Sequence, residues 1–204
     1  SETGFSEFFT VSDIISILKC TYKRFDEDLF HSYCQRFDIP LDKKTRTFST
    51  GMKAKLNIII ALTHHAKLLI LDEPTAGLDV LTRDEILDIL RDYMEQEDCT
   101  ILISSHISSD LESLCDDLYI IDHGQIIMHA EMDTLLSQYG VLKVSKEDYD
   151  NLDKDYLLEV MKEPFGYSCL TNVRQFYSEN YPTIVIEQNH IDTMIPILLK
   201  GERL

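Results

Sequence analysis

Two adjacent acids at the end of a short apolar run are the residues of this chain best suited to chemistry. The run from Leu68 to Leu71 predicts a buried strand, and Asp72 and Glu73 follow it directly. One carboxylate in such a place can hold Mg²⁺, because magnesium prefers hard oxygen ligands. The other can orient and deprotonate a water molecule. We therefore predict a nucleotide-hydrolysing site here, against the plainer alternative of a solvated turn.

A second segment, FSTGMKAK, begins at Phe48 and leads into a predicted helix. It places Ser49 and Gly51 at the helix start, where free backbone N–H groups and the helix dipole favour phosphate. Gly51 precedes Asp72 by 21 residues. The plainer alternative for Ser49 is an ordinary helix N-cap. The two segments together predict a site that binds phosphate and Mg²⁺ and uses a carboxylate to activate water.

Four segments, in their order along the chain, resemble motifs of the ATP-binding-cassette (ABC) ATPases. FSTGM resembles the family signature LSGGQ, and LLILDEP resembles the Walker B strand. AGLD at Ala76–Asp79 resembles the D-loop, and ILISSH at Ile101–His106 resembles the strand and switch histidine. Thr50 and Met52 depart from LSGGQ, and a GM-type signature is more similar to bacterial exporters than to nutrient importers. The resemblance covers about Phe8–Met132.

The resemblance implies a role for each residue near the acidic pair. Asp72 would help to hold Mg²⁺, and Glu73 would polarise the attacking water. His106 follows Glu73 by 33 residues. It would contact the γ-phosphate of ATP and hold Glu73 in place. Without the motif around it, His106 would be interpreted as an ordinary capping or core histidine.

The resemblance also implies that the signature acts on a partner. In the family it closes over ATP held by the opposite subunit of a head-to-tail dimer. Gly51 would let the backbone approach the phosphate, Ser49 would donate its hydroxyl, and the Thr50 side chain would alter the fit. Asp79 would cross the dimer interface and connect the two sites, against the alternative of a plain turn aspartate.

The phosphate-binding loop of this family is absent from the sequence. It requires Gly-x-x-x-x-Gly-Lys-Ser/Thr, and none of the seven glycines is followed by lysine. In the family this loop lies well upstream of the signature, and only 48 residues precede Ser49. We therefore expect the C-terminal part of an ABC ATPase that, alone, neither binds MgATP tightly nor hydrolyses it. Glu2 could occupy the position of the Q-loop glutamine.

Composition restricts the classes of partner. The formal net charge of −17 disfavours DNA and RNA, which would be repelled. The five cysteines form no C-x-x-C pair, which fits a reducing compartment. The longest near-apolar run, Leu56 to Leu62, is too short to cross a bilayer. We expect a cytoplasmic protein, peripheral on the inner face of the membrane, that serves separate transmembrane permease subunits.

Periodicity predicts an α/β fold, namely a partial P-loop NTPase (ABC ATPase) core with a helical subdomain and a small C-terminal α+β extension. The expected division is 1–50 for the helical subdomain up to the signature, 51–139 for the partial core, and 140–204 for the extension. The expected elements in the first two parts are helices near 14–18, 27–37, 52–67 and 86–94, a buried strand at 100–104, and a hairpin around 122–124. Capping boxes are expected at Thr82-x-x-Glu85 and Ser109-x-x-Glu112. The expected extension has strands at 141–144, 156–161, 168–171 and 183–187, with helices near 145–153, 172–180 and 191–199.

These features favour the nucleotide-binding subunit of a bacterial ABC transporter, of the exporter type. One alternative is a soluble ABC ATPase of translation or DNA repair, which the acidity, the lack of long heptads and the GM-type signature disfavour. Another is a non-catalytic interaction module, which the missing phosphate loop favours. The transported substrate is not readable from these residues.

Overall fold

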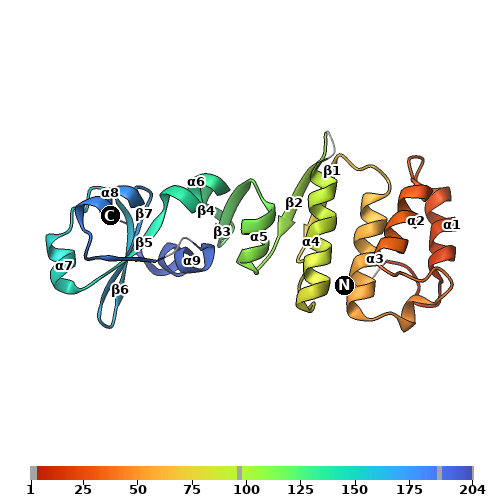
Figure 1. The fold of residues 1–204 in the computed structure, drawn as a ribbon, viewed down its shortest axis with the longest axis horizontal. Coiled ribbons are helices and arrows are strands. Elements are labelled where there is room, and N and C mark those ends of the chain that lie inside the picture. Colours follow the sequence, from red (N-terminus) through yellow and green to blue (C-terminus); the bar gives the residue numbers. More distant parts are fainter. Residues whose placement is uncertain (1–3, 96–97, 188–189, 204) are drawn as a thin grey trace. The chain divides into compact units, whose positions relative to one another are not determined.

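The structure is a computed structural model that describes residues 4–95, 98–187 and 190–203. The chain divides into two compact units, Ser1–His106 and Ile107–Leu204. Among the described residues, no helix is both long and apolar enough to cross a membrane. Both units mix helices with strands, as an α/β fold requires (Figure 1).

The first unit is built mainly from helices whose starts are set by short polar side chains. Thr10 and Asp13 form a capping box, in which each side chain accepts the backbone N–H of the other. Asp26 caps the next helix by accepting the N–H of Leu29 at 2.8 Å. Helix α2 begins at Glu27 as expected, whereas α1 begins at Val11, three residues before the expected range of 14–18. The helices are α1 (Val11–Thr21), α2 (Glu27–Arg36), α3 (Thr50–Leu62) and α4 (Val80–Met94), with a short 3₁₀ turn at Thr45–Thr47.

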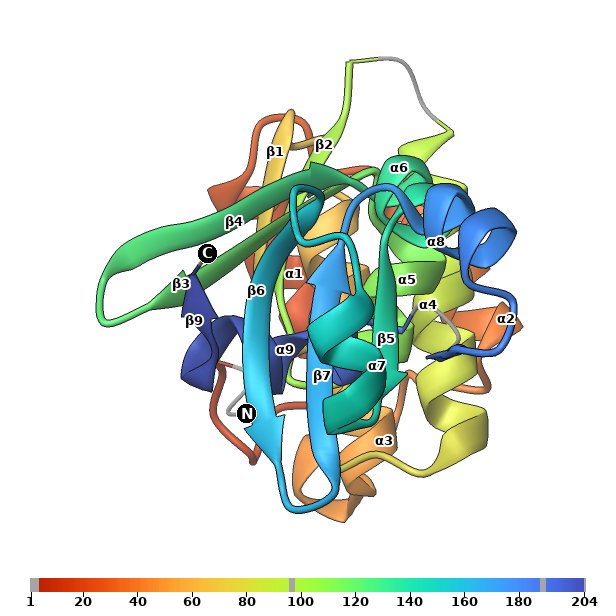
Figure 2. The same cartoon turned by 90° about the vertical axis from the view of Figure 1, so that its left-hand side faces the viewer.

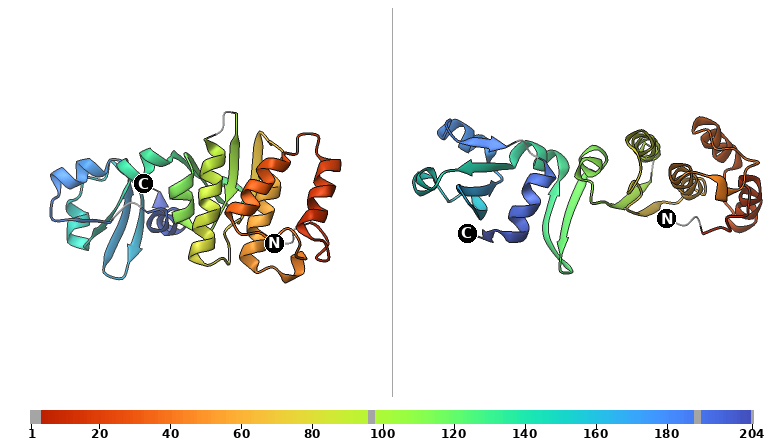
Figure 3. Two further views of the ribbon diagram at one scale, coloured as in Figure 1. Left: turned by 45° about the vertical axis from the view of Figure 1, so that its right-hand side comes forward. Right: turned by 90° about the horizontal axis from the view of Figure 1, so that it is seen from below.

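Strands β1 (Leu68–Asp72) and β2 (Thr100–Ser104) form a two-stranded parallel pair in this unit (Figure 2). The parallel pairing confirms the predicted topology. The prediction that both strands are buried is wrong, since Ile70 is 68% exposed and Leu102 is 58% exposed. Side chains alternate across a sheet, and α3 and α4 lie on one side of these strands (Figure 3). Only the other face of β1, at Leu69, is buried.

Both capping boxes expected in the middle of the chain are wrong. Helix α4 begins at Val80, so Asp79 is its N-cap and Thr82 lies inside the first turn. Helix α5 (Ser108–Leu114) begins without a side-chain cap. Glu112 instead accepts the N–H of Ile191 at 2.7 Å and so caps a later helix. The local pattern predicts that Glu112 caps its own helix, α5, but Glu112 instead makes a tertiary contact with Ile191.

The second unit begins with the expected hairpin of β3 (Asp117–Asp122) and β4 (Gln125–Glu131). A five-stranded antiparallel sheet follows, in the order β8-β5-β7-β6-β9 (Figure 2). Its strands are β5 (Gly140–Val144), β6 (Leu157–Glu163), β7 (Gly166–Thr171), β8 (Val185–Glu187) and β9 (Glu202–Arg203). The accompanying helices are α6 (Met132–Gln138), α7 (Lys146–Asn151), α8 (Arg174–Asn180) and α9 (Ile191–Lys200). All the strands and helices expected after residue 140 are present.

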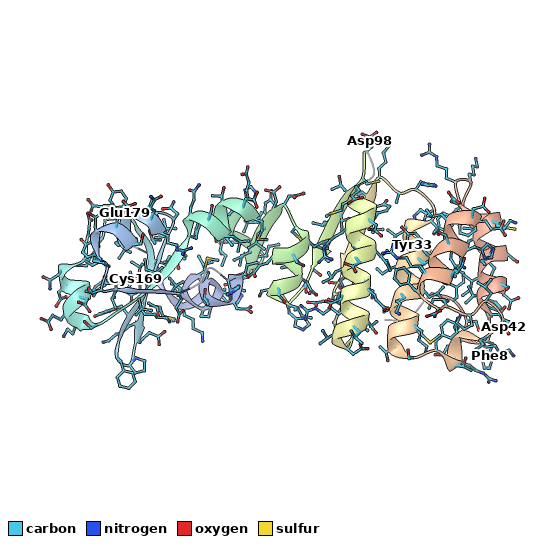
Figure 4. All side chains as sticks on the ribbon, in the orientation of Figure 1. Phe8, Tyr33, Asp42, Asp98, Cys169 and Glu179 are labelled. Carbon is cyan, nitrogen blue, oxygen red and sulfur yellow. The ribbon has the colours of Figure 1, made fainter. Side chains whose placement is uncertain are left out.

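This sheet carries a core on each face. Leu142 and Cys169 pack on one face with Tyr177 of α8, and Cys169 is labelled in Figure 4. Val141 and Leu170 pack on the other face with side chains of α6, α9 and the β3–β4 hairpin. Residues 118–135 therefore share a core with the segment after residue 140. The three-part division at 50 and 139 stays a prediction, and the compact unit seen here begins at Ile107.

Candidate catalytic and signature site

The end of β1 is joined to the end of β2 by several polar contacts. The parallel register places Asp72 opposite Ser104, whose hydroxyl donates to the Asp72 carboxylate. The backbone N–H of Glu73 donates to the Ser104 carbonyl oxygen at 3.0 Å. Glu73 itself has a φ of 49°, in the left-handed region that a non-glycine residue rarely adopts. The chain therefore turns sharply where the two acids meet.

That turn brings Glu73 to the predicted switch histidine. The Nδ1 atom of His106 lies 2.6 Å from Oε2 of Glu73. A carboxylate only accepts hydrogen bonds, so Nδ1 is the donor in this contact. The side chains are 67% and 36% exposed, respectively, so both remain accessible to a ligand. The structure brings together Asp72, Glu73 and His106, while their catalytic roles stay predictions.

The signature residues lie at the start of α3. Ser49 is the N-cap, and its hydroxyl oxygen accepts the N–H of Met52 at 3.2 Å. Thr50 and Gly51 are the first two residues of the helix. A Cβ atom added to Gly51 would lie 2.8 Å from Cγ2 of Thr82. The structure thus shows the capping contact of Ser49, and phosphate binding by this segment stays a prediction.

Asp79 lies at the start of α4, where Thr82 donates to both of its carboxylate oxygens. The Thr82 N–H reaches Oδ1 at 3.0 Å, and the Thr82 hydroxyl reaches Oδ2 at 2.8 Å. These two donors, the backbone one first, lower the pKa of the Asp79 carboxyl. The folded Asp79 carboxyl therefore stays ionised to a lower pH than an ordinary aspartate, and its role at a dimer interface stays a prediction.

Sequence reasoning missed two residues of this region. The pattern around Ser104 predicts only a strand, although its place two residues before His106 on a parallel neighbour of β1 is a signal for a contact with Asp72. The pattern Thr82-x-x-Glu85 predicts a cap at Thr82, although the spacing Asp79-x-x-Thr82 is itself a capping pattern. Glu2, the candidate Q-loop residue, lies outside the described residues.

The donor set suits Mg²⁺ held jointly with a ligand. In the part of the chain that the structure describes, no three His, Cys, Asp or Glu side chains gather as a complete metal site. Mg²⁺ commonly takes one or two carboxylates and fills its other positions with water and phosphate oxygens. Asp72 is exposed and offers a carboxylate beside the Ser104 hydroxyl. These residues therefore fit the ion in its usual nucleotide-bound form.

Comparison with known proteins identifies the class. Residues 16–109 match the family model described as "AAA domain, putative AbiEii toxin, Type IV TA system", a region that contains the acidic pair and His106. The chain is 30% identical over 151 residues to the ABC transporter ATP-binding protein YtrB of Bacillus subtilis, covering 74% of this chain and 52% of YtrB. It is 46% identical over 94 residues to the lantibiotic transport ATP-binding protein SrtF of Streptococcus pyogenes, covering 46% of this chain and 41% of SrtF.

A solved ATP-binding subunit of an ABC transporter has a similar fold, with a TM-score of 0.54 and 26% identity. The match covers 66% of this chain and 57% of that one. Fold and motifs together define an ATPase core of the P-loop NTPase class. Within this class, the chain belongs to the ABC transporter ATP-binding proteins. It spans about half the length of the curated relatives it matches.

Proposed function

We propose that the chain contributes the hydrolytic acid pair, the switch histidine and the signature of a nucleotide-binding subunit that couples ATP hydrolysis to transmembrane transport. The observation that carries the proposal is the 2.6 Å contact between His106 Nδ1 and Glu73 Oε2, next to Asp72 at the end of a parallel strand. Glu73 is the base that accepts a proton from the attacking water. His106 fixes the Glu73 carboxylate and presents its second ring nitrogen to the γ-phosphate.

Mg²⁺, when bound with ATP, supplies charge neutralisation at the transferred phosphoryl group. Asp72 is the residue that would hold it. The Ser104 hydroxyl donates to the Asp72 carboxylate and so orients its oxygens. A hydroxyl that donates to a metal-binding carboxylate restricts the rotation of that carboxylate before the ion arrives.

The proposed partners are a second ATPase subunit and separate permease subunits. Ser49, Thr50 and Gly51 close over ATP held by the second subunit, and Asp79 crosses that interface. Nucleic acid is not a partner, given the net charge of −17. The protein acts in the cytoplasm at the inner face of the membrane. The similarity to SrtF, named for lantibiotic transport, and the GM-type signature favour an exporter.

The 204-residue chain alone is proposed to be inactive, because the lysine and backbone cradle of a phosphate loop are not in its sequence. Isothermal titration calorimetry with MgATP should show no binding at micromolar concentrations. Micromolar affinity would contradict this part of the proposal.

The role of Glu73 is tested in a protein that joins residues 1–204 to an upstream segment carrying a phosphate loop. Glu73→Gln keeps the shape and removes the base, so the ATPase kcat should fall by about 10²–10⁴. ATP should still hold the dimer together, as size-exclusion chromatography would show. Glu179→Gln, on α8 and labelled in Figure 4, is the matched control and should leave kcat unchanged. An unchanged kcat in Glu73→Gln would contradict the assignment of Glu73 as the base.

A further inference from the structure

Gly51 of the signature and Thr82 of α4 approach too closely for a side chain at position 51. A Cβ atom built on Gly51 would lie 2.8 Å from Cγ2 and 3.0 Å from Oγ1 of Thr82. Real Cβ atoms essentially never come within 3.0 Å of another heavy atom. The backbone of Gly51 is ordinary helix, so glycine is not required there for its conformational freedom. A side chain is excluded at position 51 because it would clash with Thr82.

The same threonine is fixed from its other side by the D-loop. Its hydroxyl donates to Asp79 Oδ2 at 2.8 Å, and its N–H donates to Oδ1 at 3.0 Å. Thr82 is β-branched, so its methyl and hydroxyl groups turn together about one stiff χ1 bond. Any rotation that moves the methyl away from position 51 also moves the hydroxyl away from Asp79.

An ion pair on the same two helices keeps this contact in register. Lys55 Nζ of α3 lies 2.5 Å from Glu85 Oε2 of α4, and the Lys55 side chain is largely buried. Lys55 follows Gly51 by one helical turn, and Glu85 follows Thr82 by nearly one turn. Two contacts about one helical turn apart, Gly51 with Thr82 and Lys55 with Glu85, therefore hold the starts of α3 and α4 together.

We propose that Thr82 is a positioning residue that links the signature glycine to the D-loop aspartate within one chain. Its methyl group sets how closely α3 approaches α4, and its hydroxyl group sets the orientation of the Asp79 carboxylate. A displacement at Gly51 is thereby passed to Asp79, although these two residues share no direct contact in the packing described here. The use of this link in ATP-driven closure rests on the proposed function, whereas the link itself does not.

The steric half of the proposal predicts that removing the Thr82 methyl relieves the cost of a side chain at position 51. In the wild-type background, Gly51→Ala should lower Tm by roughly 2–12 °C, because overpacking outweighs the better helix propensity of alanine. In a Thr82→Ser background the clashing methyl is gone and only the hydroxyl stays at 3.0 Å, so Gly51→Ala should lower Tm by less than half as much as in wild type. Thr82→Val keeps both γ positions filled and serves as the matched control, in which Gly51→Ala should remain destabilising.

The electrostatic half is tested by following the Asp79 carboxyl carbon in an NMR pH titration of the 204-residue chain. Thr82→Val should raise the pKa of Asp79, and Thr82→Ser should leave it low. Gly51→Ala should also raise the pKa of Asp79, because it turns Thr82 away, and adding Thr82→Ser should restore the low value. Asp26, an N-cap of the separate helix α2, is the internal control and should titrate alike in every variant.

The proposal is overturned if Gly51→Ala leaves both Tm and the Asp79 titration unchanged, or if Thr82→Ser fails to rescue either one. Both measurements are made without nucleotide. Failure of the ATPase assay described above would therefore reject the proposed function and leave this link intact. Failure of the Thr82→Ser rescue would reject this link and leave the proposed function intact.

Discussion

Glu73 lies in the left-handed backbone region, with a φ of 49°, immediately after strand β1. A non-glycine residue held there costs on the order of 1–3 kcal/mol. The contact of its N–H with the Ser104 carbonyl oxygen offsets part of that cost. The same backbone turn directs the Glu73 carboxylate toward His106 rather than along the strand. The strained backbone turn at Glu73 is therefore also the feature that places its carboxylate beside His106 for the proposed chemistry.

Asp26 is a residue at which a single side chain sets a helix start. Replacing Asp26 with alanine should lower the free energy of unfolding by about 1 kcal/mol, because the N–H of Leu29 loses its acceptor. Urea denaturation followed by circular dichroism at pH 7 measures this. Asp28→Ala removes an exposed acid from the same first turn without removing the cap, and it should have a smaller effect. Equal losses would show that charge, and not capping, stabilises α2.

The pH dependence of this contribution follows from the pKa of Asp26. The Leu29 N–H, helped by the His65 ring, lowers the pKa of the folded carboxyl. A lowered folded pKa gives stability that is complete above the unfolded pKa of about 3.9 and is lost as pH falls through the folded value. Asp26→Asn keeps an acceptor but no charge. The stability difference between Asp26→Asn and wild type should therefore be constant near pH 7 and shrink below about pH 4.

At the scale of elements, the sequence predicts what local patterns control. The apolar run from Leu68 to Leu71 predicts β1 and the position of the two acids that follow it. The partnership of Glu73 with His106 was inferred from motif order, since no local pattern connects residues 33 apart. Burial and the sharing of caps could not be predicted, because both depend on which elements become neighbours. Glu112, which caps α9 instead of α5, is the clearest case.

The uncovered face of β1 and β2 predicts self-association. Ile70 and Leu102 are exposed on one face of a two-stranded pair, and exposed apolar side chains that lie side by side form a surface on which another chain can pack. Analytical ultracentrifugation should show concentration-dependent association of the wild-type chain. Ile70→Thr and Leu102→Thr together should weaken it by about tenfold or more, because each removes buried apolar area from the contact.

Val80→Thr is the matched control for that experiment. Val80 is also an exposed apolar residue, but it lies at the start of α4 and not on a strand. This variant should associate as the wild type does. A monodisperse monomer at every concentration, or equal weakening by Val80→Thr, would contradict association through the strands.

At the scale of the whole molecule, each of the two compact units has its own buried side chains. Leu56 of α3 is fully buried in the first unit. Leu142 of β5 is fully buried in the second, in a core made only of residues after 140. A unit with its own core can open as a separate cooperative unit. The described sheets also respect this division, since no strand of residues 68–104 pairs with a strand of residues 117–203.

Separate cores predict separate responses to cavity-forming substitutions. Leu56→Ala should cost about 2–5 kcal/mol in the first unit, and Leu142→Ala should cost a similar amount in the second. Hydrogen exchange read by mass spectrometry assigns the loss of protection to peptides of each unit. Leu56→Ala should accelerate exchange within 1–106 and leave β5–β7 protected, while Leu142→Ala should do the reverse. If either substitution accelerated exchange equally across both units, the chain would unfold as one cooperative whole, because the loss of one core would then remove the stability of the other.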